Sequence, residues 1–420
     1  MKNKFLTGFF SGLAGALVIV TICFTIYAKG ITPNNSSYIS GKENEQYSKN
    51  EIQAAENTIS TQEIMSKVDK LEALIDKYYM EEVNKDKLAD GIYKGLLAGL
   101  GDPYSTYYTA KEYAALMESS NGIYCGIGST VTQNVKTGVV SLVKPFVNGP
   151  AYEAGLLPGD ILYKVAGEEV TGLDLSEVVS RIKGEEGSTV TVVIIREGVS
   201  EPMTFDIKRR VIEVPTIEYQ MLKGKIGYIS ISEFDEVTAK QFRSAVTDLE
   251  KQGQVGLIVD VRDNPGGRLD TVADILDRML PEGLIVYTED KYGTREELKS
   301  SDKEKFNKPL TVLINGNSAS ASEIFAGAIQ DYKLGTIVGT TSFGKGIVQS
   351  IIPLKDGTAI KVTVSKYFTP NGRNIHGTGI EPDVAVELDS SLKQQVVIEK
   401  DKDNQLQKAI QVINEKVKNK

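Results

Sequence analysis

Residues 310–331 read LTVLINGNSASASEIFAGAIQD, and this stretch predicts how the central part of the chain folds. The apolar, β-branched run Leu310 to Ile314 is typical of a buried strand, whereas Ser320 to Asp331 carries apolar residues at helical spacing. Ser320 and Glu323 have the spacing of a capping box at the start of that helix. Taken alone, the segment favours an ordinary helix cap over a catalytic site, because such boxes are common.

The same alternation of strand and helix runs through the chain from Val214 onward, without an internal repeat. Apolar runs typical of strands and stretches with helical spacing follow one another in turn, which predicts an α/β core. The segments concerned are 225–231, 236–252, 255–261, 268–280, 284–288, 310–314 and 320–331.

Residues elsewhere in the chain indicate that a serine in this stretch is catalytic. A serine at a strand-to-helix turn is expected to expose its side chain, and the free N–H groups of the helix start can hold a developing oxyanion. A second donor is expected from residues 260–267, whose glycines let the backbone approach a substrate. Lys345 and Gln349 follow in the segment 343–349, FGKGIVQ. This combination suggests a serine nucleophile served by a lysine base.

A histidine base is a poor alternative in this sequence. The chain has one histidine, His376, and it lies in the turn-like segment 371–377, NGRNIHG. A Ser-His-Asp enzyme would depend entirely on that residue.

Lys345 must be neutral to accept a hydroxyl proton, although the pKa of a free lysine is ~10.4. Burial lowers such a pKa, and Phe343, Ile347 and Val348 are expected to supply an apolar wall. In a fully extended strand Lys345 and Gln349 would lie roughly 13 Å apart. We therefore expect a turn near Gly346.

These residues carry a family resemblance. The chain resembles the C-terminal processing (tail-specific) peptidases, which are serine peptidases with a Ser-Lys-Gln site and an embedded PDZ domain. The resemblance covers about Gln62 to Asp389 and implies a crotonase- and protease-subunit-like core. The motifs that carry it, in the family's order, are DPYST (102–106), GIG (126–128), PGDI (158–161), DxRxNPGG (260–267), SASASE (318–323), FGK (343–345) and TPxGR (369–373).

The resemblance also implies a role for each residue of the site. Ser320 is the implied nucleophile, Lys345 the general base and Gln349 the residue that orients the lysine. Gly266 and Ala321 are implied to supply the oxyanion N–H groups. No cofactor and no metal ion are implied.

Residues 122–211 alternate short strands and turns and look like the PDZ domain of that family. Gly126, Ile127 and Gly128 form the loop implied to bind substrate, because N–H groups in such a loop capture the terminal carboxylate of a peptide. A helix over 173–182 is expected to flank the groove. The implied ligand is a protein C-terminus.

The N-terminal residues predict a membrane anchor. Phe5 to Tyr27 is a stretch of 23 residues without charge, long enough to span a bilayer. Lys2 and Lys4 favour a cytoplasmic N-terminus, which places the rest outside the cytoplasm. A cleaved signal peptide is the alternative, but Ile26-Tyr27-Ala28 is a poor cleavage site.

Beyond the anchor, residues 31–61 are polar and read as a tether, and the apolar stripe from Ile64 to Tyr78 predicts a helix that serves as packed core or as a dimer seam. The whole chain therefore divides into a cytoplasmic stub (1–4), a transmembrane anchor (5–27), a linker (28–61), a helical N-terminal domain (62–117), a PDZ domain (118–212), a peptidase core (213–389) and a C-terminal helical segment (390–420).

Composition excludes several other classes of protein. The net charge of −8 and the pI of about 5.2 have the wrong sign for nucleic-acid binding. Two cysteines, Cys23 and Cys125, rule out a disulfide framework, and with a single histidine they make a structural zinc site improbable.

The sequence thus predicts a membrane-anchored, extracytoplasmic serine endopeptidase that recognises substrate C-termini and cleaves by a Ser-Lys mechanism. Its expected partners are protein or peptide substrates with accessible C-termini, and a second copy of the chain and a regulatory protein are further candidates. Two alternatives remain. One is a non-catalytic PDZ scaffold, which the presence of Ser320, Lys345 and Gln349 disfavours. The other is a crotonase-like acyl-transfer enzyme, which would need neither a PDZ domain nor an anchor.

Overall fold

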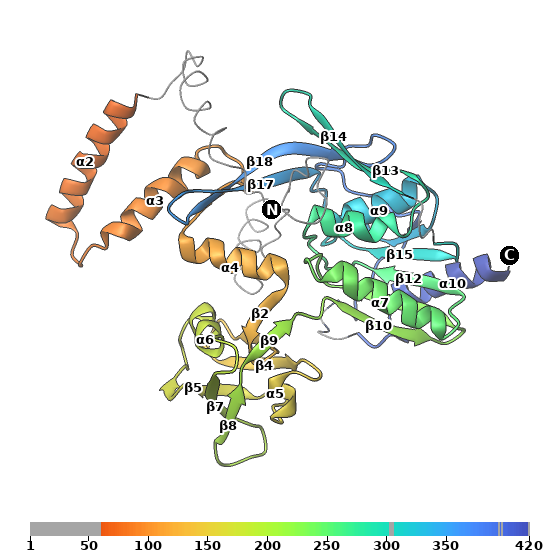
Figure 1. Cartoon of the computed structure of the whole chain (residues 1–420), viewed down its shortest axis with the longest axis horizontal. Coiled ribbons are helices and arrows are strands. Elements are labelled where there is room, and N and C mark those ends of the chain that lie inside the picture. Colours follow the sequence, from red (N-terminus) through yellow and green to blue (C-terminus); the bar gives the residue numbers. More distant parts are fainter. Residues whose placement is uncertain (1–59, 302–305, 394, 396–397, 419–420) are drawn as a thin grey trace, which may run out of the picture. The chain divides into compact units, whose positions relative to one another are not determined.

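The computed structural model describes residues 60–301, 306–393, 395 and 398–418 (Figure 1). The predicted stub, anchor and nearly all of the predicted linker therefore lie outside the described residues. Within the described ranges no helix has the length and apolar character needed to cross a membrane. Contacts divide these ranges into two units, one ending at Gly101 and the other beginning at Asp102.

The smaller unit is a pair of helices, α2 (Thr61–Tyr78) and α3 (Lys85–Ala98). Ser60 caps α2 and Asn84 caps α3, each by accepting a hydrogen bond from a main-chain N–H of the first turn. Neither helix contains a buried residue. The predicted stripe therefore forms a helix but is not packed core in this structure. Its alternative role as a dimer seam stays a prediction.

The larger unit opens with β1 (Thr106–Tyr108) and α4 (Ala110–Asn121). The strand-rich part that follows holds a six-stranded antiparallel sheet in the order β3-β4-β5-β7-β8, with β6 paired to β5, and a separate pair, β2 with β9. Its elements are β2 (Ile123–Gly126), β3 (Ser129–Gln133), β4 (Val140–Pro145), α5 (Pro150–Glu153), β5 (Ile161–Val165), β6 (Glu168–Glu169), α6 (Leu175–Ile182), β7 (Thr189–Ile195), β8 (Met203–Lys208) and β9 (Arg210–Glu213).

The predicted alternation of strand and helix is confirmed in the core sheet. The strand order is β10-β11-β12-β15-β16-β19, and every pair from β11 to β19 is parallel. The elements are β10 (Ile217–Leu222), β11 (Ile226–Ile231), α7 (Thr238–Lys251), β12 (Gly256–Asp260), α8 (Leu269–Asp277), β15 (Leu310–Ile314), α9 (Ala321–Asp331), β16 (Thr336–Gly339) and β19 (Val384–Ala385).

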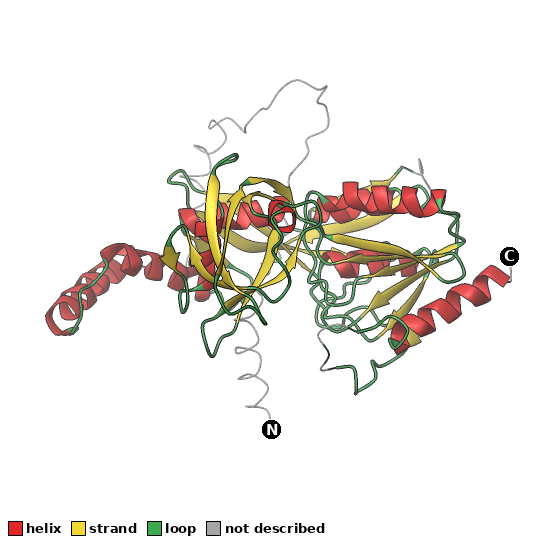
Figure 2. Ribbon diagram, turned by 90° about the horizontal axis from the view of Figure 1, so that it is seen from below, coloured by secondary structure: helices red, strands yellow, loops and turns green. Residues whose placement is uncertain are grey.

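Alternate residues of these strands face two different hydrophobic clusters. Ile229, Leu257 and Val259 pack with residues of α7, α8 and α9, whereas Tyr228 and Ile258 pack with residues of α10 (Asn404–Lys418). The C-terminal helix thus covers one face of the sheet, beside the core strands (Figure 2). The predicted C-terminal helical segment (390–420) thus contains a helix that packs against the core sheet.

A buried ion-pair network reinforces that packing. Arg262, directly after β12, lies 2.6 Å from Asp260 and 2.7 Å from Asp403. Asp403 Oδ1 also accepts hydrogen bonds from the N–H groups of Gln405 and Leu406, at the start of α10. One carboxylate therefore pairs with the core and caps the helix.

A second, antiparallel sheet completes the larger unit. Of its strands, the sequence patterns predicted only the segment 284–288, which lies within β13. Its order is β1-β18-β13-β14, with β17 paired to β18. The strands are β13 (Gly283–Asp290), β14 (Arg295–Ser300), β17 (Ile347–Pro353) and β18 (Ala359–Phe368). The pairing of β1 with β18 brings residues 106–108 against residues 359–361, more than 250 positions later in the chain. Figure 1 shows β17 and β18 running side by side.

Candidate active site

Ser320 lies where the chain passes from β15 into α9, as its N-cap residue, with φ 56° and ψ −114°. A positive φ is uncommon for a residue other than glycine and marks local strain, which often accompanies function. The side chain was expected to be exposed but is fully buried. The reason is the close approach of residue 266, where an added Cβ would lie 2.8 Å from the Cβ of Ser320.

The three serines of the SASAS stretch differ in the hydrogen bonds of their hydroxyl groups. Ser318 Oγ donates to the carbonyl of Val261 at 2.7 Å, and Ser322 Oγ donates to the carbonyl of Asn264 at 2.9 Å. Ser320 Oγ is buried and has no hydrogen-bond partner in the described part of the chain. The outer two serines therefore hold the neighbouring loop, and the middle hydroxyl is left available for chemistry.

Glu323 joins the start of α9 to the segment that carries Lys345. Its carboxylate accepts hydrogen bonds from the N–H groups of Ser320 (2.9 Å), Gly344 (2.7 Å) and Lys345 (2.8 Å) and from the hydroxyl of Ser342 (2.5 Å). The bond to Ser320 N–H confirms the Glu323 half of the predicted capping box. Burial raises the pKa of Glu323, and these four hydrogen bonds oppose the rise.

Lys345 is buried, with 5% of its surface exposed. Burial and the neighbouring Lys361 lower its pKa to about 8, while Glu323 and Asp102 act in the opposite direction. Of the expected apolar wall, Ile347 and Val348 are buried, whereas Phe343 is 47% exposed. The Lys345 amine instead lies over the ring of Tyr104, 4.7 Å from its centre.

Gln349 is buried in β17, and its Nε2 donates to the hydroxyl of Thr363 at 3.2 Å. Its Oε1 has no hydrogen-bond partner among the described residues. Because Ser320 Oγ also lacks a partner, no described hydrogen bond joins Lys345 to Ser320 or to Gln349.

The prediction of a turn near Gly346 is wrong. Residues 341–346 are irregular, β17 begins at Ile347, and the register of its pairing with β18 shifts between Val348 and Gln349.

The two predicted oxyanion donors lie next to Ser320. Ala321 is the first residue of α9 and is buried, and residue 266 packs against the main chain of Ala319 and Ala321. The N–H of Gly266, however, donates to Asn264 Oδ1 at 2.8 Å, and Asn264 is anchored in turn by its bond to the carbonyl of Ile231. That hydrogen bond must break before the Gly266 N–H can bind an oxyanion.

The single histidine has an exposed side chain and lies in a turn, and its N–H donates to Asn374. No described hydrogen bond joins His376 to Ser320.

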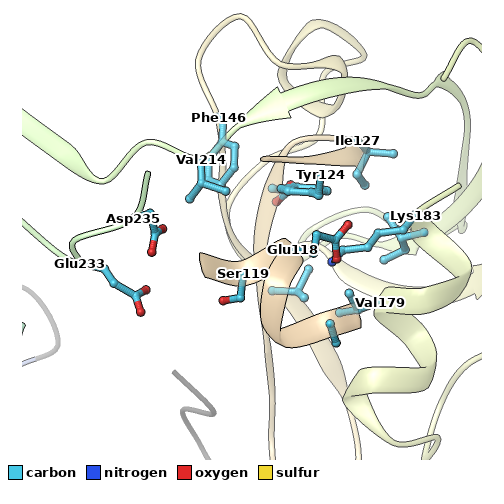
Figure 3. A pocket seen from close by; sticks show the side chains of 14 residues that line it. Glu118, Ser119, Tyr124, Ile127, Phe146, Val179, Lys183, Val214, Glu233 and Asp235 are labelled. Atoms are coloured by element: carbon cyan, nitrogen blue, oxygen red, sulfur yellow. The ribbon is translucent and has the colours of Figure 1, made fainter. Parts of the chain in front are cut away.

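A pocket of about 300 Å³ lies beside the predicted peptide-binding loop (Figure 3). Ile127, Tyr124 and Phe146 line it, together with Val179 and Ile182 from α6, which confirms a helix beside the groove. In Figure 3 the ring of Tyr124 and the side chain of Ile127 lie near the side chain of Lys183.

The loop itself has the geometry that glycine permits. Gly126 ends β2, and a Cβ there would meet the ring of Tyr124 at 2.9 Å. Gly128 has φ 72°, in the left-handed region. Lys183 forms an ion pair with Glu118 at the pocket wall.

Comparison with known proteins identifies the family of this chain. Residues 225–386 match the model of peptidase family S41, residues 139–196 match a PDZ domain, and residues 27–112 match the N-terminal domain of the activating protease CtpB. The fold and the site thus define a serine-type peptidase of family S41.

Three related proteins show to which group of peptidases the chain belongs. The carboxy-terminal processing protease CtpB of Bacillus subtilis is 40% identical over 77% of this chain and 68% of its own, and CtpA of the same organism is 37% identical over 77% and 70%. The carboxyl-terminal-processing protease of Synechocystis is 37% identical over 70% and 69%. The chain belongs to the carboxy-terminal processing proteases.

Sequence patterns missed part of the site. Tyr104 and Thr363 contact Lys345 and Gln349, but β1 and β18 bring them there from distant parts of the chain. The DPYST motif contains Tyr104 and marked it as part of the family resemblance, but the motif did not predict the contact between Tyr104 and Lys345. Glu323 was recognised only as a helix cap.

We predict that Ser320→Ala abolishes cleavage of an unfolded protein and leaves the fold intact, because its hydroxyl makes no structural hydrogen bond. Ser318→Ala, the matched control, should remain active and lose about 1 kcal/mol of stability with its hydrogen bond. Cleavage rates and urea unfolding measure both effects. Parental cleavage by Ser320→Ala would show that another residue is the nucleophile.

The rate of cleavage should rise with pH and reach half its plateau near pH 8, where the Lys345 amine loses its proton. Lys345→Arg should be nearly inactive, because a guanidinium keeps its proton. Lys361→Met should move the midpoint to higher pH by removing a repelling charge. The kcat/KM profiles measure these shifts.

Two further measurements bear on the same lysine. His376→Ala should leave the pH profile unchanged, and a folded but inactive His376→Ala protein would contradict the lysine assignment. Since the folded pKa lies below 10.5, the unfolded chain binds more protons between about pH 8 and 10.5. Lys345 should therefore make the free energy of unfolding increase with pH between about pH 8 and 10.5. Lys345→Met should lack this increase.

Proposed function

We propose that this protease is an endopeptidase in which Ser320 is the nucleophile, Lys345 the general base and Gln349 the residue that orients the lysine. The observation that carries the proposal is the buried, unpartnered hydroxyl of Ser320. Glu323 accepts hydrogen bonds from the main-chain N–H groups of both Ser320 and Lys345, and burial lowers the pKa of this lysine to about 8. At neutral pH about a tenth of such a lysine is already neutral and able to accept a proton.

The proposed reaction has two halves. Ser320 Oγ attacks the scissile carbonyl carbon while its proton passes to Lys345 Nζ. The N–H of Ala321 holds the oxyanion, and the N–H of Gly266 joins it once its hydrogen bond to Asn264 breaks. Lys345 then gives the proton to the leaving amine, which leaves an acyl-enzyme ester. Water, deprotonated by the same lysine, cleaves the ester and restores the Ser320 hydroxyl.

We further propose that the pocket beside Ile127 binds the free C-terminus of the substrate. Burial raises the pKa of the Tyr124 hydroxyl to about 12, while hydrogen bonds from the N–H groups of Ser129 and Gly128 oppose the rise. These N–H groups therefore lie within reach of a hydroxyl that lines the pocket. Donors in this position suit a carboxylate, and the apolar wall suits an apolar last residue.

A substrate ending in apolar residues and a free carboxylate should be cleaved faster than the same substrate with an amidated C-terminus, which loses the charge but keeps its shape. Gly128→Val should remove this preference, because its φ of 72° and the nearby side chain of Ile212 both oppose a Cβ. Gly198→Val is the matched control, since its φ is 79° and its surroundings are open. Cleavage rates of the two substrates give the answer. Equal rates with the parental enzyme would remove C-terminal recognition from the proposal.

We propose that residues 5–27 anchor the chain in a membrane, with the peptidase outside the cytoplasm. The proposal is supported by the length of this stretch, which carries no charge, and by the lysines before it. A membrane-impermeant thiol reagent should then modify Cys125, which is half-buried, in intact cells. Denatured protein is the positive control. Labelling that requires cell lysis would contradict an extracytoplasmic peptidase.

A further inference from the structure

The segment Asp102–Ser105 lies against the proposed site but has no role in the mechanism described above. It directly precedes β1, whose pairing with β18 places Thr106 opposite Lys361. The segment is thereby held beside Thr363, two residues further along β18, and Thr363 is the hydrogen-bond partner of Gln349.

Hydrogen bonds fix Asp102 firmly in this position. Asp102 Oδ2 accepts from the hydroxyls of Ser105 and Thr363, each at 2.6 Å, and Oδ1 accepts from the N–H of Tyr104 at 3.0 Å. Ser105 Oγ accepts from the N–H of Thr363 at 3.1 Å. The segment is therefore bonded to both the main chain and the side chain of one residue of β18.

The charge on Asp102 sets the direction of the whole chain of hydrogen bonds. An ionised carboxylate can only accept, so the single hydroxyl proton of Thr363 is committed to Asp102. Thr363 Oγ1 can then only accept from Gln349, which must present its Nε2. The amide oxygen, Oε1, is consequently directed away from Thr363 and remains without a partner.

We propose that Asp102 is a positioning residue of this peptidase, which through Thr363 fixes the amide of Gln349 so that Oε1 is available to accept a hydrogen bond from Lys345. The inference rests on the proposed roles of Gln349 and Lys345. If the amide were flipped, its NH₂ group would face Lys345. A protonated lysine has only hydrogen-bond donors and could not bond to that group. The orientation of the amide therefore decides whether Gln349 can form a hydrogen bond with Lys345.

Two other observations agree with this role. Burial alone would raise the pKa of Asp102, but hydrogen bonds from Ser105, Thr363 and Tyr104 hold it below its ordinary value, so the carboxylate stays ionised. The charged or titratable groups that act on Lys345 are Lys361, Glu323 and Asp102, with the ring of Tyr104 beneath its amine. The segment thus supplies both the carboxylate and the aromatic contact.

Thr363→Val removes the hydroxyl and keeps the shape, so it tests the hydrogen-bond chain directly. We expect kcat to fall by about 10- to 100-fold, the range that a misplaced catalytic group produces, with KM changed less than twofold. Thr363→Ser should restore kcat, because the hydroxyl returns. Thr358→Val is the matched control. Its hydroxyl bonds Asp356 at 2.6 Å at the far end of the same hairpin, so kcat should be unchanged.

The charge and the hydrogen bond can be separated by a second variant. In Asp102→Asn the amide can donate to Thr363, which reverses the chain and frees Gln349 to flip, so kcat should fall as in Thr363→Val. Loss of the charge should also move the pH midpoint of kcat/KM downward, because Asp102 raises the pKa of Lys345. Thr363→Val keeps that charge, so its midpoint should not move. A purely structural role would lower the melting temperature without producing this difference.

A double-mutant cycle decides whether Asp102 acts through Gln349. On the high-pH plateau, where the shift in the Lys345 pKa has no effect on the rate, Asp102→Asn should cost nothing further in kcat when combined with Gln349→Ala. Full kcat in Thr363→Val, or additive losses in the cycle, would overturn the inference and leave the roles of Ser320 and Lys345 standing. Full activity in Gln349→Ala would also overturn it, and the activity of Ser320→Ala would then decide the proposed function separately.

Discussion

The proposed site depends on the carboxylate of Glu323. A buried carboxylate is costly unless hydrogen bonds satisfy it, and here three main-chain N–H groups and one hydroxyl do so. Two of those N–H groups belong to Ser320 and Lys345 themselves. The main-chain N–H groups of the proposed nucleophile and of the proposed base therefore donate to the same oxygen atom, Glu323 Oε2, although 25 positions separate the two residues in the sequence.

The negative charge of Glu323 also affects the pKa of Lys345, the proposed base. Desolvation and Lys361 favour the neutral form of Lys345, while the negative charges of Glu323 and Asp102 favour the protonated form. A site with desolvation alone would hold a lysine that rarely accepts and keeps a proton, and a site with the carboxylates alone would hold one that never releases it. The balance leaves the pKa at about 8, so that near neutral pH both the protonated and the neutral form of the lysine are present.

Sequence patterns predicted the parallel sheet well, because β12 and β15 are mostly apolar and α7 to α9 show a helical period. The antiparallel sheet was largely missed. Arg295–Ser300 reads REELKS, which lacks the alternation of a half-buried strand, and β1 has only three residues. Since β1 and β18 carry Asp102 and Thr363 to the site, their contacts depend on pairing between distant residues, which no local pattern contains. The serine and the lysine, by contrast, sit in short motifs that could be recognised directly.

The backbone conformation at Ser320, the proposed nucleophile, limits which residues can take its place. Its φ of 56° is strained for any residue with a Cβ, and it is far less accessible to a β-branched one. Threonine, a nucleophile in some other hydrolases, would meet this strain. Cysteine has no such branch. At the position of the proposed nucleophile, the backbone thus accommodates a thiol more readily than a secondary alcohol.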